Sequence, residues 1–166
     1  GHRVPVIANG SIADLDDVRE CIQQTGVDGV MSSQALLEYP ALFLETNTKA
    51  TEGRRTGPGR VQLAREFLDL CREHPPEVGG QASGLKCIRA HVHKMLHADL
   101  QGPCIDVRDL VAFHGKSMEV IYDAAKRVED SQAERGHKVE DEQLTWYTRH
   151  RHLINEDGEN KKTENE

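Results

Sequence analysis

The chain has 166 residues, a formal net charge of −7, and apolar residues at only 37% of its positions. Ordinary globular domains are roughly 45–50% apolar, so we expect a modest core over part of the chain and loop or tail elsewhere. Because no run of about 18 apolar residues and no apolar signal region is present, we expect neither a membrane span nor a secretory signal. The four cysteines show no C-x-x-C spacing, which favours free thiols in a reducing compartment, the cytoplasm or the nucleus.

The N-terminal segment, residues 1–45, alternates strand and helix signals. Apolar runs over residues 4–8 and 28–31 predict two short strands. Between them, Asp14 is placed to cap a helix with apolar residues at i, i+3 and i+7, and Gly26 suits the C-terminal end of that helix. A further apolar helical stretch follows the second strand. This β-α-β-α order predicts parallel strands joined by helical crossovers.

The two predicted strands do not make a stable sheet by themselves. Their faces need cover and their edges need partners. In addition, the chain has no initiator Met and is already in its first apolar run at Val4. We therefore expect a fragment that contains the end of a larger α/β sheet or of a barrel.

Three further segments follow in chain order. Residues 46–60 contain three Gly, one Pro and no apolar period, which predicts a linker. Residues 61–135 have apolar stripes at helical spacing, which predict a small antiparallel helical bundle. Residues 136–166 are highly charged, and we expect a poorly ordered tail there. The predicted fold class is thus α/β plus all-α.

The turns after the two strands have the composition of a phosphate-binding site. Asn9-Gly10 follows the first strand and Ser32-Ser33 follows the second, each at the start of a helix. Gly10 allows a close approach of the backbone to an anion, and free N–H groups at a helix start attract one. An ordinary turn and an ordinary helix cap explain the same residues equally well.

Several stretches resemble one known family. They are VPVIANGSI at residues 4–12, DV at 17–18, TGVDGVM at 25–31, PALF at 40–43 and IRAHVHK at 88–94. The first four resemble the last two βα units of tRNA-dihydrouridine synthases, and the fifth is similar to the R-x-H-x-x-K helix of the C-terminal tRNA-contacting domain in that family. The SSQA sequence at 32–35, together with PALF, is most similar to the eukaryotic branch that modifies D-loop positions 16 and 17.

This resemblance implies the last two units of a TIM (β/α)₈ barrel, followed by a helical tRNA-binding domain. It implies a flavoenzyme that reduces a tRNA uridine to 5,6-dihydrouridine with FMN recharged by NADPH or NADH. The residues that match the FMN-phosphate loops of the family are Asn9, Gly10, Gly29, Met31, Ser32 and Ser33.

Two departures from the family pattern matter. Many members have Gly-Arg where this chain has Ser32-Ser33, so an arginine contact to the phosphate does not carry over. The cysteine that protonates uracil in the family lies in barrel units that precede Gly1, and none of the four cysteines of this chain matches it. We interpret Cys21, Cys71, Cys87 and Cys104 as structural thiols and expect no catalytic residue in this chain and no activity of the chain alone.

The stretch around residues 86–94 predicts a basic helix face. Lys86, Arg89, His93 and Lys94 lie off the predicted core face of this helix. From the residues alone, a solvated face is the simpler interpretation, whereas the resemblance favours contact of Arg89, His91 and Lys94 with tRNA. His91 also suits a partly buried core position.

A metal site is not expected on this helix. His91 and His93 at i and i+2 point to different faces, and no cysteine or carboxylate pattern completes a ligand set.

The main hypothesis is therefore the C-terminal portion of an FMN-dependent tRNA-dihydrouridine synthase, with the rest of the barrel as a required partner. The alternative is a non-catalytic RNA-binding module left from a truncated synthase. A third option, another FMN-binding barrel such as a dihydroorotate dehydrogenase-like enzyme, is disfavoured by the R-x-H-x-x-K helix.

Overall fold

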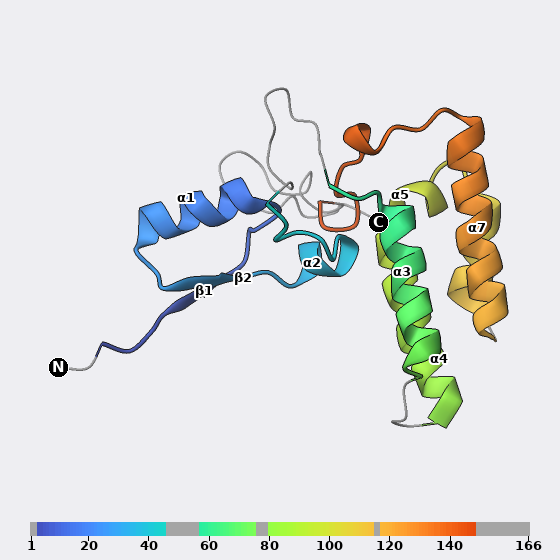
Figure 1. Cartoon of the computed structure of the whole chain (residues 1–166), viewed down its shortest axis with the longest axis horizontal. Coiled ribbons are helices and arrows are strands. Elements are labelled where there is room, and N and C mark those ends of the chain that lie inside the picture. The colour runs from blue at the N-terminus through green and yellow to red at the C-terminus, as the bar shows by residue number, and fades with distance from the viewer. Residues whose placement is uncertain (1–2, 46–56, 76–79, 115–116, 149–166) are drawn as a thin grey trace, which may run out of the picture.

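The computed structural model describes residues 3–45, 57–75, 80–114 and 117–148. An α/β part formed by the N-terminal residues lies beside a helical part. From the end of the last long helix, the chain crosses back toward the α/β part (Figure 1). We call this returning stretch, residues 137–148, the C-terminal segment. In the described part of the chain, no helix is both long enough and apolar enough to cross a membrane.

The α/β part has the predicted element order. It consists of β1 (Ile7–Asn9), α1 (Leu15–Thr25), β2 (Gly29–Met31) and α2 (Gln34–Glu38). β1 and β2 pair in parallel, with Ile7 opposite Gly29 and Asn9 opposite Met31. The prediction of two parallel strands joined by a helix is confirmed.

Helix α1 begins and ends at the residues expected from the sequence. The Asp14 carboxylate accepts hydrogen bonds from the N–H groups of Asp16 and Asp17 at 3.0 and 2.9 Å. At the other end, Gly26 adopts a left-handed conformation with φ of 66°. Its N–H donates to the Ile22 carbonyl at 2.9 Å, which satisfies one of the last carbonyls of the helix.

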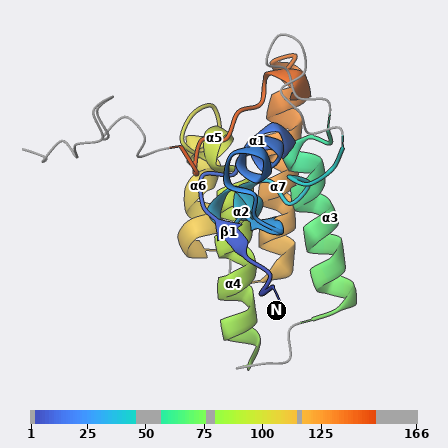
Figure 2. The same cartoon turned by 90° about the vertical axis from the view of Figure 1, so that its left-hand side faces the viewer.

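The helical part is built from three long helices. They are α3 (Arg60–Glu73), α4 (Gly80–Met95) and α7 (Met118–Glu134), with the short α5 (His97–Leu100), α6 (Ile105–Asp109) and the π-helical η1 (Leu110–His114) between α4 and α7. The long helices run alongside one another (Figure 2). Their apolar stripes meet in one core, in which Leu68, Val92 and Ile121 are fully buried. After Asp106 the chain continues through α6 and η1, and α7 is a separate helix that begins at Met118.

The expectation of disorder from Gly136 onward is wrong for the C-terminal segment. This segment contains a 3₁₀ turn, η2 (Val139–Asp141), and buries Leu144 in the core of the α/β part beside Ile12, Tyr39 and Leu42. Composition misleads here because one charged residue of the segment, Glu142, is buried against Arg60. Residues 149–166 lie outside the described part of the chain.

Glu142, Arg60 and Glu38 form a buried charged cluster, at which the C-terminal segment, α3 and the α/β part meet. The Arg60 guanidinium donates to the Glu38 carboxylate at 3.2 Å and lies 3.5 Å from that of Glu142. The backbone N–H of Arg60 donates to Glu142 at 3.0 Å. Arg60, expected at the end of the linker, is instead the first residue of α3 and only 4% exposed. Of the predicted linker, residues 46–56 lie outside the described part.

The strands, in contrast, are poorly covered. Ile7 of β1 is 60% exposed, Met31 of β2 is 50% exposed, and Val4 just before β1 is 77% exposed. Apolar strand residues of a parallel sheet are ordinarily buried on both faces. The described residues therefore leave several apolar strand side chains without cover.

Candidate functional site

Two cavities are lined by some of the residues singled out by the sequence. We call the first the turn cavity, because it lies where β1 and β2 end. It has a volume of about 180 Å³ and is lined by Gly10, Ser11, Ile12, Ser32, Ser33, Gln34 and Tyr147. Because β1 and β2 are parallel and in register, the turns that follow them meet at the same edge of the sheet.

The backbone at Gly10 explains why the first turn needs a glycine. Its φ of +117° lies in a region that residues with a side chain rarely adopt. A Cβ there would meet no atom within 4 Å, so the requirement is conformational and not one of space. The next residue, Ser11, has a φ of 58°, also on the left-handed side. The two residues together turn the chain sharply out of β1.

The two serines of the second turn differ in what their hydroxyls do. Ser32 is buried, and its hydroxyl donates to the Ile12 carbonyl at 3.0 Å, which ties the second turn to the first. Ser33 is exposed and precedes α2 without a side-chain capping bond. Of these two serines, Ser33 is the one whose hydroxyl remains available to a ligand in the turn cavity.

The predicted cofactor residues do not all reach this cavity. Gly10, Ser32 and Ser33 line it, whereas Asn9, Gly29 and Met31 do not. Asn9 and Met31 are strand residues that pair with each other. Gly29 lies opposite Ile7, and a Cβ atom at Gly29 would lie 3.9 Å from the Ile7 side chain. Tyr147 was not expected to contribute, because the C-terminal segment was predicted to be disordered.

The turn cavity fits the phosphate end of FMN. Its volume is several times the roughly 30 Å³ occupied by one water molecule, so a phosphate group has room. None of its lining residues is basic, so the attraction has to come from backbone N–H groups and from neutral side-chain donors such as Ser11 and Ser33. This agrees with the absence of the Gly-Arg pair that many tRNA-dihydrouridine synthases have in the second turn.

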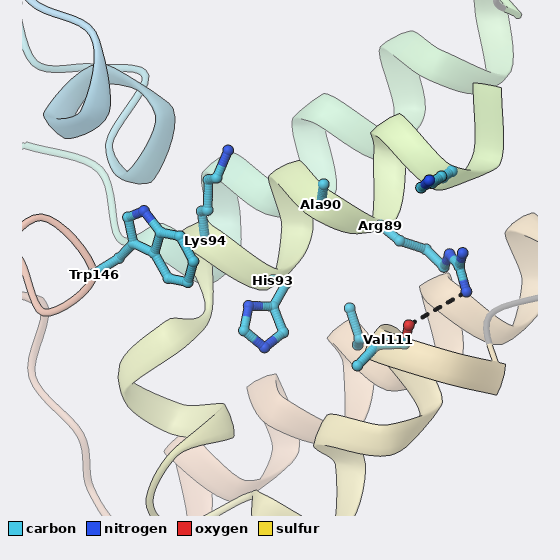
Figure 3. A pocket seen from close by; sticks show the side chains of 8 residues that line it. Arg89, Ala90, His93, Lys94, Val111 and Trp146 are labelled. Atoms are coloured by element: carbon cyan, nitrogen blue, oxygen red, sulfur yellow. Dashed lines mark hydrogen bonds between the residues drawn. The ribbon is translucent and has the colours of Figure 1, made fainter. Parts of the chain in front are cut away.

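The second cavity, which we call the basic cavity, lies along α4. It has a volume of about 320 Å³ and is lined by Lys86, Arg89, Ala90, His93, Lys94, Val111, Ala112 and Trp146. Trp146 lies at one end, Arg89 at the other, and His93 between them (Figure 3). Four of the eight lining residues are basic and none is acidic.

The basic residues of this cavity make few hydrogen bonds and ion pairs within the described part of the chain. Arg89 donates to the Ala112 carbonyl at a long 3.4 Å, and its buried Nε has no partner in the described part of the chain. The Lys94 ammonium lies 5.9 Å from the centre of the Trp146 ring. Among the described residues, neither Lys86, Arg89 nor Lys94 forms a salt bridge, whereas Arg60, Arg65 and Arg135 each do.

His93 is held among aromatic and cationic groups. Its ring meets the rings of Trp146 and His97 edge to face, with centres 6.0 and 6.1 Å away. Burial lowers the pKa of His93, and the nearby His97, Arg108 and Lys94 lower it further. His93 is therefore neutral at pH 7, and the positive charge of the basic cavity comes from Lys86, Arg89 and Lys94.

His91 lies on another face of α4. Its ring packs against Phe67 of α3, with centres 5.5 Å apart, and burial followed by the charge of Lys94 lowers its pKa. At 100° per residue, positions 86, 89, 90, 93 and 94 fall within an arc of about 140°, and position 91 lies about 60° outside that arc, on the side of Lys94. The structure thus brings Arg89 and Lys94 together with Lys86 and His93, and separates His91 from them.

The cysteines occupy scattered positions. Cys104 is buried in the helical core, Cys21 and Cys71 are half-buried, and Cys87 is exposed on α4. Burial raises the pKa of Cys71. None of the four lines the turn cavity or the basic cavity. Within the described residues, no group of three or more His, Cys, Asp or Glu side chains is arranged to hold a metal ion.

Comparison with known proteins places these sites in a family context. A family model described as "Dihydrouridine synthase (Dus)" matches residues 2–111. A Mus musculus protein named tRNA-dihydrouridine(16/17) synthase (NAD(P)(+))-like is 45% identical over 98 residues, which are 59% of this chain and 17% of that protein. The Schizosaccharomyces pombe tRNA-dihydrouridine(16/17) synthase is 32% identical over 91 residues, which are 55% of this chain and 22% of that protein.

The matched region includes both the turn cavity residues of β1 and β2 and the basic residues of α4, but ends before the C-terminal segment. The chain spans less than a quarter of the length of these curated relatives. No solved structure gives a match.

Proposed function

The chain belongs to the dihydrouridine synthase family, and from that premise we propose that it is the C-terminal portion of an FMN-dependent tRNA-dihydrouridine synthase. The resemblance to the eukaryotic 16/17 branch makes a D-loop uridine the substrate. In the complete enzyme, bound FMN recharged by NADPH or NADH supplies the hydride that reduces this uridine to 5,6-dihydrouridine. The proton comes from a cysteine in a part of the barrel outside this chain.

In this proposal, the turn cavity holds the phosphate of FMN. The supporting observation is that Gly10 and Ser33, from turns after two separate strands, line one cavity of suitable size. Backbone N–H groups and the Ser33 hydroxyl bind the phosphate without a cation. The pairing of Ser32 with the Ile12 carbonyl keeps the two turns together before FMN arrives.

The two βα units belong to a TIM barrel in this proposal. The exposed apolar side chains of Val4, Ile7 and Met31 support it, because further parallel strands and their helices would cover them. The helices from α3 to α7 form the appended helical domain. The chain alone then lacks most of the barrel and is inactive.

The helical domain binds tRNA through the basic cavity. Three cations without carboxylate partners among the described residues, Lys86, Arg89 and Lys94, lie along one face of α4 and can neutralise RNA phosphates. His91 packs against Phe67 of α3 and so stabilises the position of α4. A cytoplasmic or nuclear location, where tRNA is modified, belongs to the same proposal.

The family match over both parts of the chain is the observation that carries this function, and two binding measurements test it. The first is the affinity of the purified chain for a tRNA transcript at several salt concentrations. Replacing both Arg89 and Lys94 by Gln should weaken binding and reduce the slope of log K against log salt by about 2. Lys126→Gln, on α7 outside the cavity, changes the charge equally and serves as the control for each replacement. An unchanged slope in the double variant contradicts the tRNA assignment.

The second measurement is FMN binding, followed by quenching of flavin fluorescence. Gly10→Ala should weaken binding because an alanine disfavours the backbone conformation that shapes the turn cavity. Gly136→Ala places the same substitution at a φ of +62° away from the cavity, and should leave FMN binding unchanged. Equal effects of the two substitutions contradict the cofactor assignment.

A non-catalytic RNA-binding module is the second candidate function. The closed core of the helical part favours it, because that part can keep the basic cavity intact without the rest of a barrel. Chain that binds tRNA but stays free of FMN at saturating FMN concentrations supports the module. Stoichiometric FMN supports the synthase portion.

A further inference from the structure

Trp146 forms one end of the basic cavity, and it comes from outside the family match. The matched region ends at residue 111, whereas Trp146 lies in the C-terminal segment. It is the only tryptophan of the chain. The segment that was expected to be disordered thus completes a cavity on α4 with an aromatic ring.

The position of Trp146 is fixed by the residues on either side of it. The backbone N–H groups of Thr145 and Tyr147 both donate to the buried Glu38 carboxylate, at 2.7 and 2.9 Å. The Thr145 hydroxyl pairs with Nδ1 of His97 at 3.0 Å. The indole ring is therefore held in place before any ligand arrives, which reduces the entropy cost of binding to it.

The lining of the cavity combines an apolar floor with cations at its rim. Ala90, Val111 and Trp146 supply apolar surface, and Lys86 and Arg89 supply positive charge without any acidic lining residue. Lys86 and Lys94 are eight residues apart on α4, which places them about 12 Å apart along the helix axis. A ligand with a flat ring and a neighbouring phosphate can contact Trp146 with its ring and Lys86 and Arg89 with its phosphate.

A nucleotide has this combination. Bases stack on tryptophan rings regardless of sequence, and lysine and arginine neutralise the adjoining phosphates. A peptide would need an acidic side chain next to an apolar one, whereas a nucleotide carries the ring and the negative charge in one unit. The lack of carboxylate partners for Lys86 and Arg89 within the described residues favours a polyanion.

We propose that Trp146, Lys86 and Arg89 form a binding site for one unstacked nucleotide of RNA, with its base against Trp146 and its phosphates at Lys86 and Arg89. The inference rests on the proposed function, because tRNA supplies the nucleotide. Glu38, which holds the backbone on both sides of Trp146, acts as a positioning residue from the α/β part. RNA binding then depends on the C-terminal segment as well as on α4.

The fluorescence of the single tryptophan reports directly on this site. Titration with a hexauridylate should quench Trp146 fluorescence to saturation, because a stacked base lies against the ring. Inorganic tripolyphosphate, which has the anionic charge and no base, should bind at Lys86 and Arg89 and leave most of the fluorescence. Equal quenching by the two probes, or none by the hexauridylate, overturns the proposal.

Affinity measurements on variants give a second test. Trp146→Leu should weaken binding of the tRNA transcript roughly 5- to 150-fold, the range for loss of one base–aromatic stack. Trp146→Phe should recover most of this loss, since a smaller ring still stacks. Thermal melting of both variants checks that the C-terminal segment remains folded.

The outcomes separate this inference from the proposed function. If the transcript binds and its affinity is the same for Trp146→Leu as for the unsubstituted chain, the nucleotide site is wrong and tRNA binding stands. If the transcript does not bind to the unsubstituted chain, both are overturned. If Trp146→Leu and Trp146→Phe lose affinity equally, the ring acts through packing and not through stacking, which also overturns the site.

Discussion

The two parts of the molecule differ in how they cover their apolar side chains. In the helical part, stripes from α3, α4 and α7 meet in one closed core. In the α/β part, a small cluster around Tyr39 and Leu42 is buried, but Ile7 and Met31 on the strands remain half exposed or more. The helical part therefore buries its apolar side chains by itself, whereas the exposed apolar side chains of the strands need additional structure to cover them.

The junction between these parts belongs to neither core. The Glu38, Arg60 and Glu142 cluster joins α2, the start of α3 and the C-terminal segment, and each of the three residues is nearly inaccessible. Buried charges are tolerated only when they are paired and hydrogen-bonded, because desolvation penalises an isolated charge heavily. The relative placement of the two parts thus depends on these polar contacts together with the packing of Leu63 of α3 against the apolar cluster of the α/β part. The basic cavity includes Trp146 of the C-terminal segment and therefore depends on the same junction.

The largest expected effect is at this junction. Arg60→Met leaves two carboxylates buried with their cation removed, and should lower the free energy of unfolding by about 3–5 kcal/mol. Urea denaturation of the chain, followed by circular dichroism, measures it. Arg65→Met is the matched control on the same helix, because Arg65 pairs with Glu129 on the surface, where a pair contributes at most about 1 kcal/mol. If the two substitutions have similar effects, the cluster does not hold the junction.

The next prediction compares the two parts directly. Leu68→Ala opens a cavity in the closed helical core and should cost about 2–5 kcal/mol of unfolding free energy. Ile7→Ala removes a side chain that is 60% exposed, and should change stability by at most about 0.5 kcal/mol. Both are measured by the same denaturation experiment. A loss at Ile7 as large as that at Leu68 would mean that β1 is covered in the isolated chain, which contradicts the proposed barrel contacts.

Much of this arrangement is predictable from the sequence, because local patterns determine it. Helix α1 begins after Asp14 and ends before Gly26, as the capping preferences of these residues predict. The apolar stripe of α4 faces the core at the expected positions. The same periodicity places Arg89 and Lys94 on one face. Pattern and motif conflict at His91, where the motif indicates RNA contact, whereas the ring packs against Phe67 outside the basic cavity.

The C-terminal segment was not predictable because its order depends on partners distant in the sequence. In the sequence, Glu142 is one of several acidic residues in a row, and Leu144 is an apolar residue without apolar periodicity around it. Their burial follows from Arg60 and from the cluster around Tyr39, more than 80 residues earlier in the chain. Composition describes the average of a segment, whereas two specific contacts suffice to order it.

The smallest expected effect is a dependence of stability on pH at the contact between the helical part and the C-terminal segment. Burial lowers the pKa of His93, and His97, Arg108 and Lys94 add to the shift. The unfolded chain therefore binds a proton at this residue more readily than the folded chain does, so stability is complete above the unfolded pKa of about 6.5 and falls as the pH decreases through it.

Comparison of melting temperatures at pH 7.5 and pH 5.5 measures this dependence. Acidic pH also protonates carboxylates, so the informative quantity is the difference between the unsubstituted chain and His93→Gln, which should lose less stability on acidification. Because protonated His93 is repelled by Lys94, which lies over the Trp146 ring, quenching of tryptophan fluorescence by acrylamide should also increase at pH 5.5 in the unsubstituted chain. The same acid loss in both proteins would show that His93 does not couple the C-terminal segment to the helical part.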